Sequence, residues 1–128
     1  MNARAKSPAA LQARVEGAAA GWNDVCRYDD LGPERGVAAL VAGEQVALFR
    51  TFDGMLHAIG NRDPFSGAFV LSRGIVGSHG DVPTVASPLF KQVFDLRTGI
   101  CLTDPEVAVP VHDVRRSGER VEIRVRGG

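Results

Sequence analysis

Short runs of alternating apolar and polar residues dominate the chain after residue 21. The last run, residues 120–126, alternates strictly, so that Val121, Ile123 and Val125 face one side and charged residues face the other. A period of two residues is typical of a half-buried β-strand. Further short runs between turn-forming residues are predicted as strands over residues 22–26, 36–41, 45–50, 55–59, 91–96, 100–102 and 107–114. The sequence therefore predicts an all-β protein, built as a small β-sandwich or barrel.

Glycine and proline mark the ends of these strands. Gly43 and Gly54 each stand where two predicted strands join as a hairpin. Residues 97–99 are expected to form a tight turn between two predicted strands, with a positive φ angle at Gly99. Pro110 has no backbone N–H, which predicts an edge position for the strand at 107–114.

The chain divides into an extension and one domain. Residues 1–21 are rich in alanine and carry only a thin apolar stripe at helical spacing, which predicts a mobile N-terminal extension, either a docking arm or an untethered terminus. Residues 22–128 form a domain of ordinary size. Its middle part, residues 60–88, is interrupted by many glycines and prolines and is predicted to form functional loops or inserted hairpins.

Charge and hydropathy exclude two classes of partner. Fifteen basic residues balance fifteen acidic ones, which removes the electrostatic case for nucleic-acid binding. No run approaches the roughly 20 apolar residues of a membrane helix. Arg4 and Lys6 are not followed by the apolar core of a signal peptide. We therefore expect a soluble, cytoplasmic protein with neither nucleic acid nor membrane as its partner.

No residue pattern predicts catalysis or metal binding. The two cysteines are 75 positions apart and are expected to be small buried apolar residues. The three histidines have no second ligand at a metal-binding spacing and are expected at the surface or in hydrogen bonds. We therefore predict no catalytic, cofactor-binding or metal-ligating residue, including at Cys26, Cys101, His57, His79 and His112.

The order of turns from Trp22 to Val125 resembles the Rieske fold, in which a β-sandwich base carries a smaller loop subdomain with a [2Fe–2S] cluster. In that family one loop supplies Cys-x-His and a second loop supplies Cys-x-x-His. The resemblance implies that the four ligand positions here are Asn61, Asp63, Ser87 and Phe90. None of them offers a thiolate or an imidazole, so we expect a Rieske-like domain without a cluster.

Three segments carry a narrower resemblance: residues 63–66 (DPFS), 70–77 (VLSRGIVG) and 86–92 (ASPLFKQ). With them the chain resembles the small subunits of cytoplasmic NAD(P)H-dependent nitrite reductases of nitrate assimilation. The resemblance implies a non-catalytic subunit with no cofactor of its own. Its implied partner is a large subunit that carries FAD, an iron–sulfur cluster and siroheme and reduces nitrite to ammonium.

The tips of the two loops are the predicted docking surface, because partners approach Rieske proteins there. The candidate contacts are Arg62, Asp63, Phe65, Arg73 and Lys91. In the opposing interpretation these charges only solvate the loops, and Asp63 or Ser87 only holds backbone amides, as short polar side chains do in turns. Three other functions stay open: a Rieske-type electron carrier, which needs two cysteines and two histidines at the loops, a cluster-less regulatory or binding module for another protein, and a barrel that binds peptide or nucleic acid.

Overall fold

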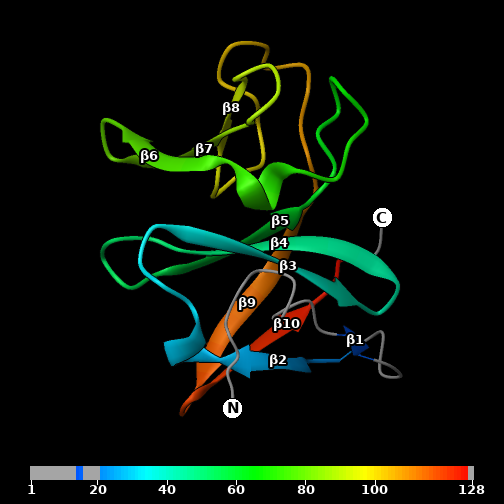
Figure 1. Cartoon of the computed structure of the whole chain (residues 1–128), viewed down its shortest axis with the longest axis vertical. Coiled ribbons are helices and arrows are strands. Elements are labelled where there is room, and N and C mark those ends of the chain that lie inside the picture. Colours follow the sequence, from blue (N-terminus) through cyan, green and yellow to red (C-terminus); the bar gives the residue numbers. More distant parts are fainter. Residues whose placement is uncertain (1–13, 16–20, 127–128) are drawn as a thin grey trace.

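The computed structural model describes residues 14–15 and 21–126 and arranges them in two β-sheets (Figure 1). The larger sheet has the strand order β1-β3-β4-β5-β9-β10-β2, and the smaller one has the order β6-β7-β8. The two ends of the larger order, β1 and β2, approach each other, so that this sheet is a nearly closed barrel. The all-β prediction is confirmed. Along the chain the elements are β1 (Arg14–Val15), β2 (Asn23–Arg27), the 3₁₀ helix η2 (Tyr28–Asp30), β3 (Arg35–Val41), β4 (Glu44–Arg50), β5 (Leu56–Gly60), the 3₁₀ helix η3 (Leu71–Arg73), β6 (Ile75–His79), β7 (Val82–Ala86), β8 (Val93–Asp95), β9 (Val111–Ser117) and β10 (Arg120–Arg124).

The larger sheet, which we call the base barrel, closes around apolar side chains that point inward from alternate positions. A two-residue turn joins β3 to β4, where Ala42 and Gly43 have positive φ angles of 49° and 82°. Such a turn matches the twist of the strands that it connects. Each fully buried aliphatic side chain stabilises the fold by about 1.5–3 kcal/mol. The interior of the barrel includes Val37, Val41, Val46, Leu48, Ala58, Val121 and Ile123.

The strands of the base barrel lie close to where the alternation predicts them. Val121 and Ile123 are fully buried, as predicted from the strict alternation of the last run. The predicted edge position at Pro110 is wrong, because β9 lies between β5 and β10. Pro110 precedes the first paired residue of β9, so its missing N–H breaks no bond of the sheet. Its carbonyl oxygen accepts the N–H of Gly60 at 2.9 Å.

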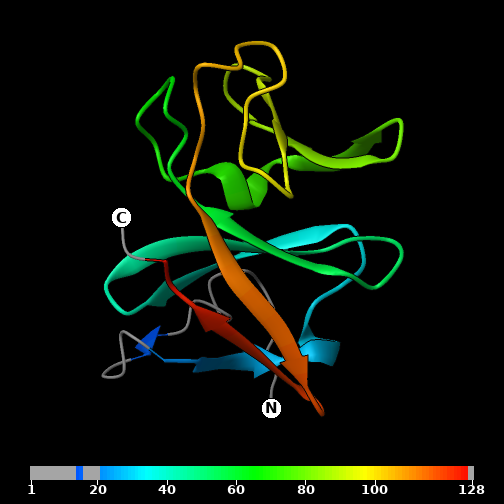
Figure 2. The same ribbon diagram turned by 180° about the vertical axis from the view of Figure 1, so that it is seen from behind.

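Residues 61–109 form an insertion that leaves the base barrel after β5 and returns just before β9. Figure 2 shows β9, in orange, running from the end of this insertion down into the barrel. The insertion contains η3 and the smaller sheet, which we call the apical sheet. Residues 75–86, where the sequence predicts loops or inserted hairpins, form the hairpin of β6 and β7.

A second apolar core joins the apical sheet to the outside of the base barrel. The barrel contributes Ala47 and Phe49 from β4, and the apical unit contributes Val85 and Phe94, all fully buried. Strand β4 is therefore buried on both faces, with Val46 and Leu48 of its other face inside the barrel. Its nearly continuous apolar run is the local signal for this position, since a strand covered on both faces lacks polar alternation.

Gly99 has a φ angle of +77°, which confirms the predicted turn. Its N–H donates to the carbonyl of Asp95 at 2.7 Å, and the N–H of Asp95 donates to the carbonyl of Ile100 at 2.9 Å. The predicted strand at 100–102 is only partly realised, because its residues form single bridges to Phe94 and Ala108.

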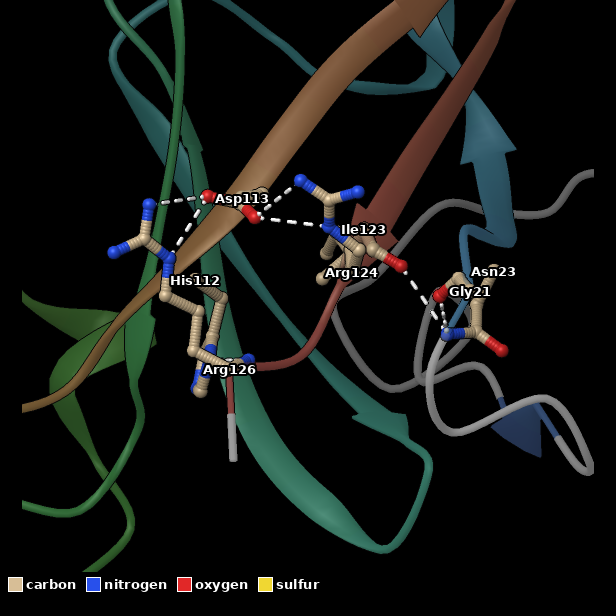
Figure 3. A network of polar contacts seen from close by, with 7 residues as sticks. All are labelled: Gly21, Asn23, His112, Asp113, Ile123, Arg124 and Arg126. Atoms are coloured by element: carbon tan, nitrogen blue, oxygen red, sulfur yellow. Dashed lines mark hydrogen bonds and ion pairs between the residues drawn. The ribbon is translucent and has the colours of Figure 1, made fainter. Parts of the chain in front are cut away.

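Ion pairs cover the outer face of the barrel around β9 and β10. Asp113 accepts hydrogen bonds from Arg124 and Arg126 at 2.8–3.0 Å, and Asn23 of β2 donates to the carbonyl of Ile123 at 3.2 Å (Figure 3). Exposed pairs of this kind each contribute about 0–1 kcal/mol. This face is therefore a solvated surface on an interior that is held mainly by apolar packing.

The predicted mobile extension, residues 1–21, lies largely outside the described residues. Arg14 and Val15 form β1, which pairs in parallel with Leu40 and Val41 of β3. The stretches of chain that the structure describes contain no helix with the length and apolarity needed to cross a membrane.

Candidate functional site: two loops at the apex

Two hydrogen-bonded loops meet in the apical unit, in the upper part of Figure 1. The first loop, residues 61–70, follows β5 and is turned by the N–H of Gly67, which donates to the carbonyl of Asp63 at 2.7 Å. The second loop, residues 87–92, follows β7 and is closed by the N–H of Ser87, which donates to the carbonyl of Gln92 at 2.9 Å. Two of the four positions implied by the Rieske resemblance lie on each loop.

Asp63 and Ser87 connect the two loops directly. The hydroxyl of Ser87 donates to Oδ2 of Asp63 at 2.6 Å. The other carboxylate oxygen of Asp63 accepts the N–H of Phe65 at 2.8 Å, and Oγ of Ser87 accepts the N–H of Leu89 at 3.3 Å. Both side chains are buried, with 0% and 1% of their surface exposed. A buried polar group without a partner costs free energy, and here every group of the pair is satisfied.

Asn61 holds the first loop to η3. Its Oδ1 accepts the N–H of Ser72 at 2.7 Å, and its Nδ2 donates to the carbonyl of Phe69 at 3.3 Å. The backbone of Asn61 adds a bond from the N–H of Leu71 at 3.1 Å. The side chain is 2% exposed, so the amide serves the fold rather than a ligand.

Phe90, at the fourth position, is exposed, whereas the other three are buried. Its ring is 60% exposed and its neighbour Leu89 is 50% exposed. Lys91, with a φ angle of +60°, follows them. Sequence reasoning considered Phe90 only as a former ligand position and missed Leu89 and Phe90 as surface residues. The available signal was their place in a loop between Pro88 and Lys91, since an apolar pair outside a strand has no core face to fill.

The predicted contact residues fall into two groups. Arg62, Phe65, Arg73 and Lys91 are exposed, with Arg73 at the last residue of η3. Asp63 is fully buried, so it lies beneath the surface and supports it from inside. The structure brings the two loops together through Asp63, while Arg73 stands beside them on η3.

The donor set of the two loops does not fit a [2Fe–2S] cluster. A Rieske cluster requires two thiolates and two imidazoles. The four positions offer an amide, a carboxylate, a hydroxyl and a phenyl ring, and the three polar ones are already hydrogen bonded. Within residues 14–15 and 21–126, no group of three or more Cys, His, Asp or Glu is arranged to hold a metal ion.

Neither cysteine stands at one of these four positions. Cys26 is buried on β2, and burial raises the pKa of its thiol to about 12. Cys101 is buried beside β8, where it forms a single bridge to Phe94, and its Sγ donates to Oε1 of Gln92 at 3.7 Å. Gln92 is thereby anchored to the segment that follows Gly99 and fixes the end of the second loop. The prediction of two small buried residues is confirmed.

A separate cleft of about 300 Å³ lies between the turn after β4 and the turn after β6. Three exposed carboxylates line it, those of Glu34, Asp53 and Asp81, together with the ring of Phe52. Asp53 is already bonded to the hydroxyl of Thr51 at 2.6 Å, which lowers the pKa of its carboxyl. Nothing in this arrangement points to a particular reaction, so the two loops are the stronger candidate site.

Comparison with known families agrees with the fold. Residues 21–124 match the family described as "Rieske-like [2Fe-2S] domain". The chain is 43% identical to the nitrite reductase (NADH) small subunit of Escherichia coli K12 over 104 residues, which are 80% of this chain and 96% of the relative. A crystal structure from Mycobacterium tuberculosis, provisionally assigned as an NADH-dependent nitrite reductase small subunit, is 52% identical. It superposes with a TM-score of 0.80 over 84% of this chain and 97% of the other.

Two further similarities bear on the site. A nitrite reductase [NAD(P)H] large subunit from Klebsiella oxytoca is 38% identical over 100 residues, which are 78% of this chain but 10% of that protein. The ferredoxin of carbazole 1,9a-dioxygenase from Nocardioides aromaticivorans is 26% identical, with a TM-score of 0.69 over 80% of this chain and 98% of the other. The same fold therefore occurs within a large reductase chain and as a small electron carrier.

Proposed function

This chain belongs to the family of Rieske-like [2Fe-2S] domains, among the small subunits of nitrite reductases, and from that membership we propose how it acts. It serves the large subunit of an NAD(P)H-dependent nitrite reductase as a binding partner, without carrying electrons itself. The large subunit, with FAD, an iron–sulfur cluster and siroheme, performs the reduction of nitrite in the cytoplasm during nitrate assimilation.

One observation carries the redox-silent part of this proposal. Asp63 and Ser87, which stand where two cluster ligands would be, are hydrogen bonded to each other at 2.6 Å in the interior. Neither side chain can release its partner to bind iron without leaving a buried polar group unsatisfied. The similarity to a ferredoxin of the same fold suggests an alternative function, that of an electron carrier. The side chains at the four loop positions of this chain argue against that alternative, because they include no thiolate and no imidazole.

The similarity to part of a large subunit supports the choice of partner. In the Klebsiella oxytoca relative, the matching 100 residues belong to the large-subunit chain itself. A domain that is covalently part of its partner in one protein is a natural non-covalent partner in another. The contact proposed for this chain runs through the exposed side chains of the two loops and η3, namely Arg62, Phe65, Arg73 and Lys91.

A spectroscopic experiment tests the redox-silent role. The chain is purified, incubated with iron and sulfide, and examined by visible absorption and EPR. We expect a colourless protein without stoichiometric iron, because the loops lack thiolate and imidazole. A stable Rieske-type EPR signal would instead make it an electron carrier.

A binding experiment tests the partnership. The chain and the large subunit of the same organism are co-expressed, and complex formation and nitrite-dependent oxidation of NAD(P)H are measured. We expect Arg62→Glu and Lys91→Glu each to weaken the complex, while Arg35→Glu, at the start of β3 on the base barrel, leaves it unchanged. A wild-type chain that neither binds the large subunit nor alters its activity would favour a module for another partner.

A further inference from the structure

The hydrogen bond between Asp63 and Ser87 organises the backbone on both of its sides. From Asp63 the chain of bonds extends to the N–H of Phe65 in the first loop, and from Ser87 it extends to the N–H of Leu89 in the second. We call these four hydrogen-bonded groups the latch. Because the Ser87 hydroxyl donates to one loop and accepts from the other, its loss would break the link between the loops. The latch thus occupies the place where a cluster would join two such loops.

Three of the exposed apolar side chains of the two loops belong to the residues at the ends of the latch or directly after it, and we call them the cap: Phe65, Leu89 and Phe90. They are 36%, 50% and 60% exposed. The ring of Phe65 also packs on buried Phe94, with centroids 6.3 Å apart, which fixes one side of the cap to the core. Apolar side chains gathered on rigid loops are typical of a binding surface, because little conformational entropy is lost when they bind.

The exposed charges of the two loops themselves have one sign. Within these loops the charged residues are Arg62, Asp63 and Lys91. The carboxylate of Asp63 is buried in the latch, whereas both basic side chains are exposed. Exposed carboxylates, those of Asp104 and Glu106, belong to the neighbouring segment, whose Thr103 bonds to Gln92. The two loops therefore carry apolar side chains beside positive charges, and their complement is an apolar recess with acidic groups facing Arg62 and Lys91.

We propose that the cap docks into such a recess on the large subunit and that the latch is the device that positions the cap. This inference rests on the proposed function, since it takes the large subunit as the partner. It assigns Leu89 and Phe90 as anchors of the interface, and Asp63 and Ser87 as positioning residues that touch no partner atom.

The cap is tested with the double variant Leu89→Ser/Phe90→Ser, which changes only exposed side chains. Its affinity for the purified large subunit is compared with that of Phe52→Ser/Met55→Ser. That control removes two apolar side chains, 77% and 58% exposed, from the turn after β4 on the base barrel. We expect at least about a tenfold loss for the cap variant and less than twofold for the control. Equal affinities would overturn the assignment of the cap.

The latch is tested with Ser87→Ala, and amide hydrogen exchange is measured on the free chain. A purely local role would speed exchange only at Leu89, whose N–H bonds to Ser87 directly. We expect exchange at Phe65, in the other loop, to accelerate several-fold as well, and affinity for the large subunit to fall with it. The control Ser78→Ala changes an exposed serine of β6. Unchanged exchange at Phe65 would overturn the latch.

These experiments distinguish a failure of the proposed function from a failure of the cap or the latch. If the wild-type chain does not bind the large subunit, the proposed function fails and the cap loses its partner, while the exchange measurement still decides the latch. If the wild type binds and the cap variant binds equally well, the proposed function stands and the interface lies elsewhere on the molecule.

Discussion

At Gly99 the fold leaves room for a hydrogen atom and nothing larger. The residue has a φ angle of +77°, and an added Cβ would overlap the carbonyl oxygen of Val109. Gly80 offers a matched comparison, since its φ angle is +65° but nothing lies within 4 Å of the added atom. We expect Gly80→Ala to lower the free energy of unfolding by about 1–2 kcal/mol through the dihedral alone. Gly99→Ala should lower the free energy of unfolding clearly more than Gly80→Ala does.

Urea unfolding of the two glycine variants measures the difference between them. The excess at Gly99 reports the steric contact with Val109, because both variants share the unfavourable dihedral. Equal losses would mean that the backbone around Val109 moves aside without cost.

At the scale of single residues, His112 should make the free energy of unfolding depend on pH. It is 4% exposed on β9, and its Nδ1 accepts the N–H of Arg126 at 3.2 Å (Figure 3). Burial lowers the pKa of His112 below its ordinary value of 6.5, against the opposing influence of Glu44 and Asp113. Below about pH 6.5 the unfolded chain therefore binds a proton that the folded chain resists. The free energy of unfolding should fall as the pH drops through this window.

His112→Asn should reduce this slope, since Oδ1 of asparagine can accept the Arg126 N–H without titrating. Urea unfolding at several pH values from 7.5 to 5 measures it. Some slope is expected to stay, because burial also lowers the pKa of His57. The exposed His79 supplies the control variant, His79→Asn. If His112→Asn leaves the slope unchanged, His112 is not the source of the pH dependence.

At the scale of elements, a strand can be predicted when its own sequence shows which of its faces is buried. β10 could be predicted because Val121 and Ile123 alternate with charged residues, so one strand displays its own buried face. β6 and β7 could not be assigned as strands, because Gly77 interrupts the first and Val85 is the only fully buried apolar residue of the second. Their pairing depends on the apical core, which brings together residues distant in the sequence.

At the site, too, local sequence predicts some features and contacts between distant residues decide the others. The sequence predicted the two loops, one after the strand that ends at Ile59 and one before the strand that contains Phe94, because turn order and short motifs are local. It did not reveal that Asp63 is buried or that Phe90 is exposed, since both depend on how the second loop meets the first. Side-chain burial in a loop has no periodic signature, so three-dimensional contacts are needed to distinguish a supporting residue from a contacting one.

Asn61 offers a test of how η3 is held. Replacing it by alanine leaves the N–H of Ser72 without its buried acceptor, which should lower the free energy of unfolding by about 1–3 kcal/mol. Ser66 is the matched control in the same loop, because its Oγ accepts the N–H of Ala68 in an exposed position. Ser66→Ala should change stability by no more than about 0.5 kcal/mol. Thermal and urea unfolding measure both, and equal effects would contradict the role of Asn61.

At the scale of the whole molecule, the insertion separates a stable frame from the loops that it carries. The insertion begins and ends at adjacent points, since the N–H of Gly60 donates to the carbonyl of Pro110 at 2.9 Å. The base barrel has its own interior core, whereas the apical sheet has three strands and shares its apolar core with the outside of the barrel. Opening of the apical unit therefore need not disrupt the pairing within the barrel.

This arrangement predicts two levels of stability. In native-state hydrogen exchange, amides of the apical pairing between β7 and β8 should exchange with a lower free energy of opening than those of the pairing between β4 and β5. Val85 and Phe94 report the first level, and Ala47 and Ile59 report the second, because the register places each of these two pairs at a hydrogen-bonded position of its ladder. Addition of the large subunit should then protect the apical unit selectively, because the cap belongs to it. One common free energy of opening for all four amides would instead make the molecule a single cooperative unit, in which the loops are as rigid as the barrel beneath them.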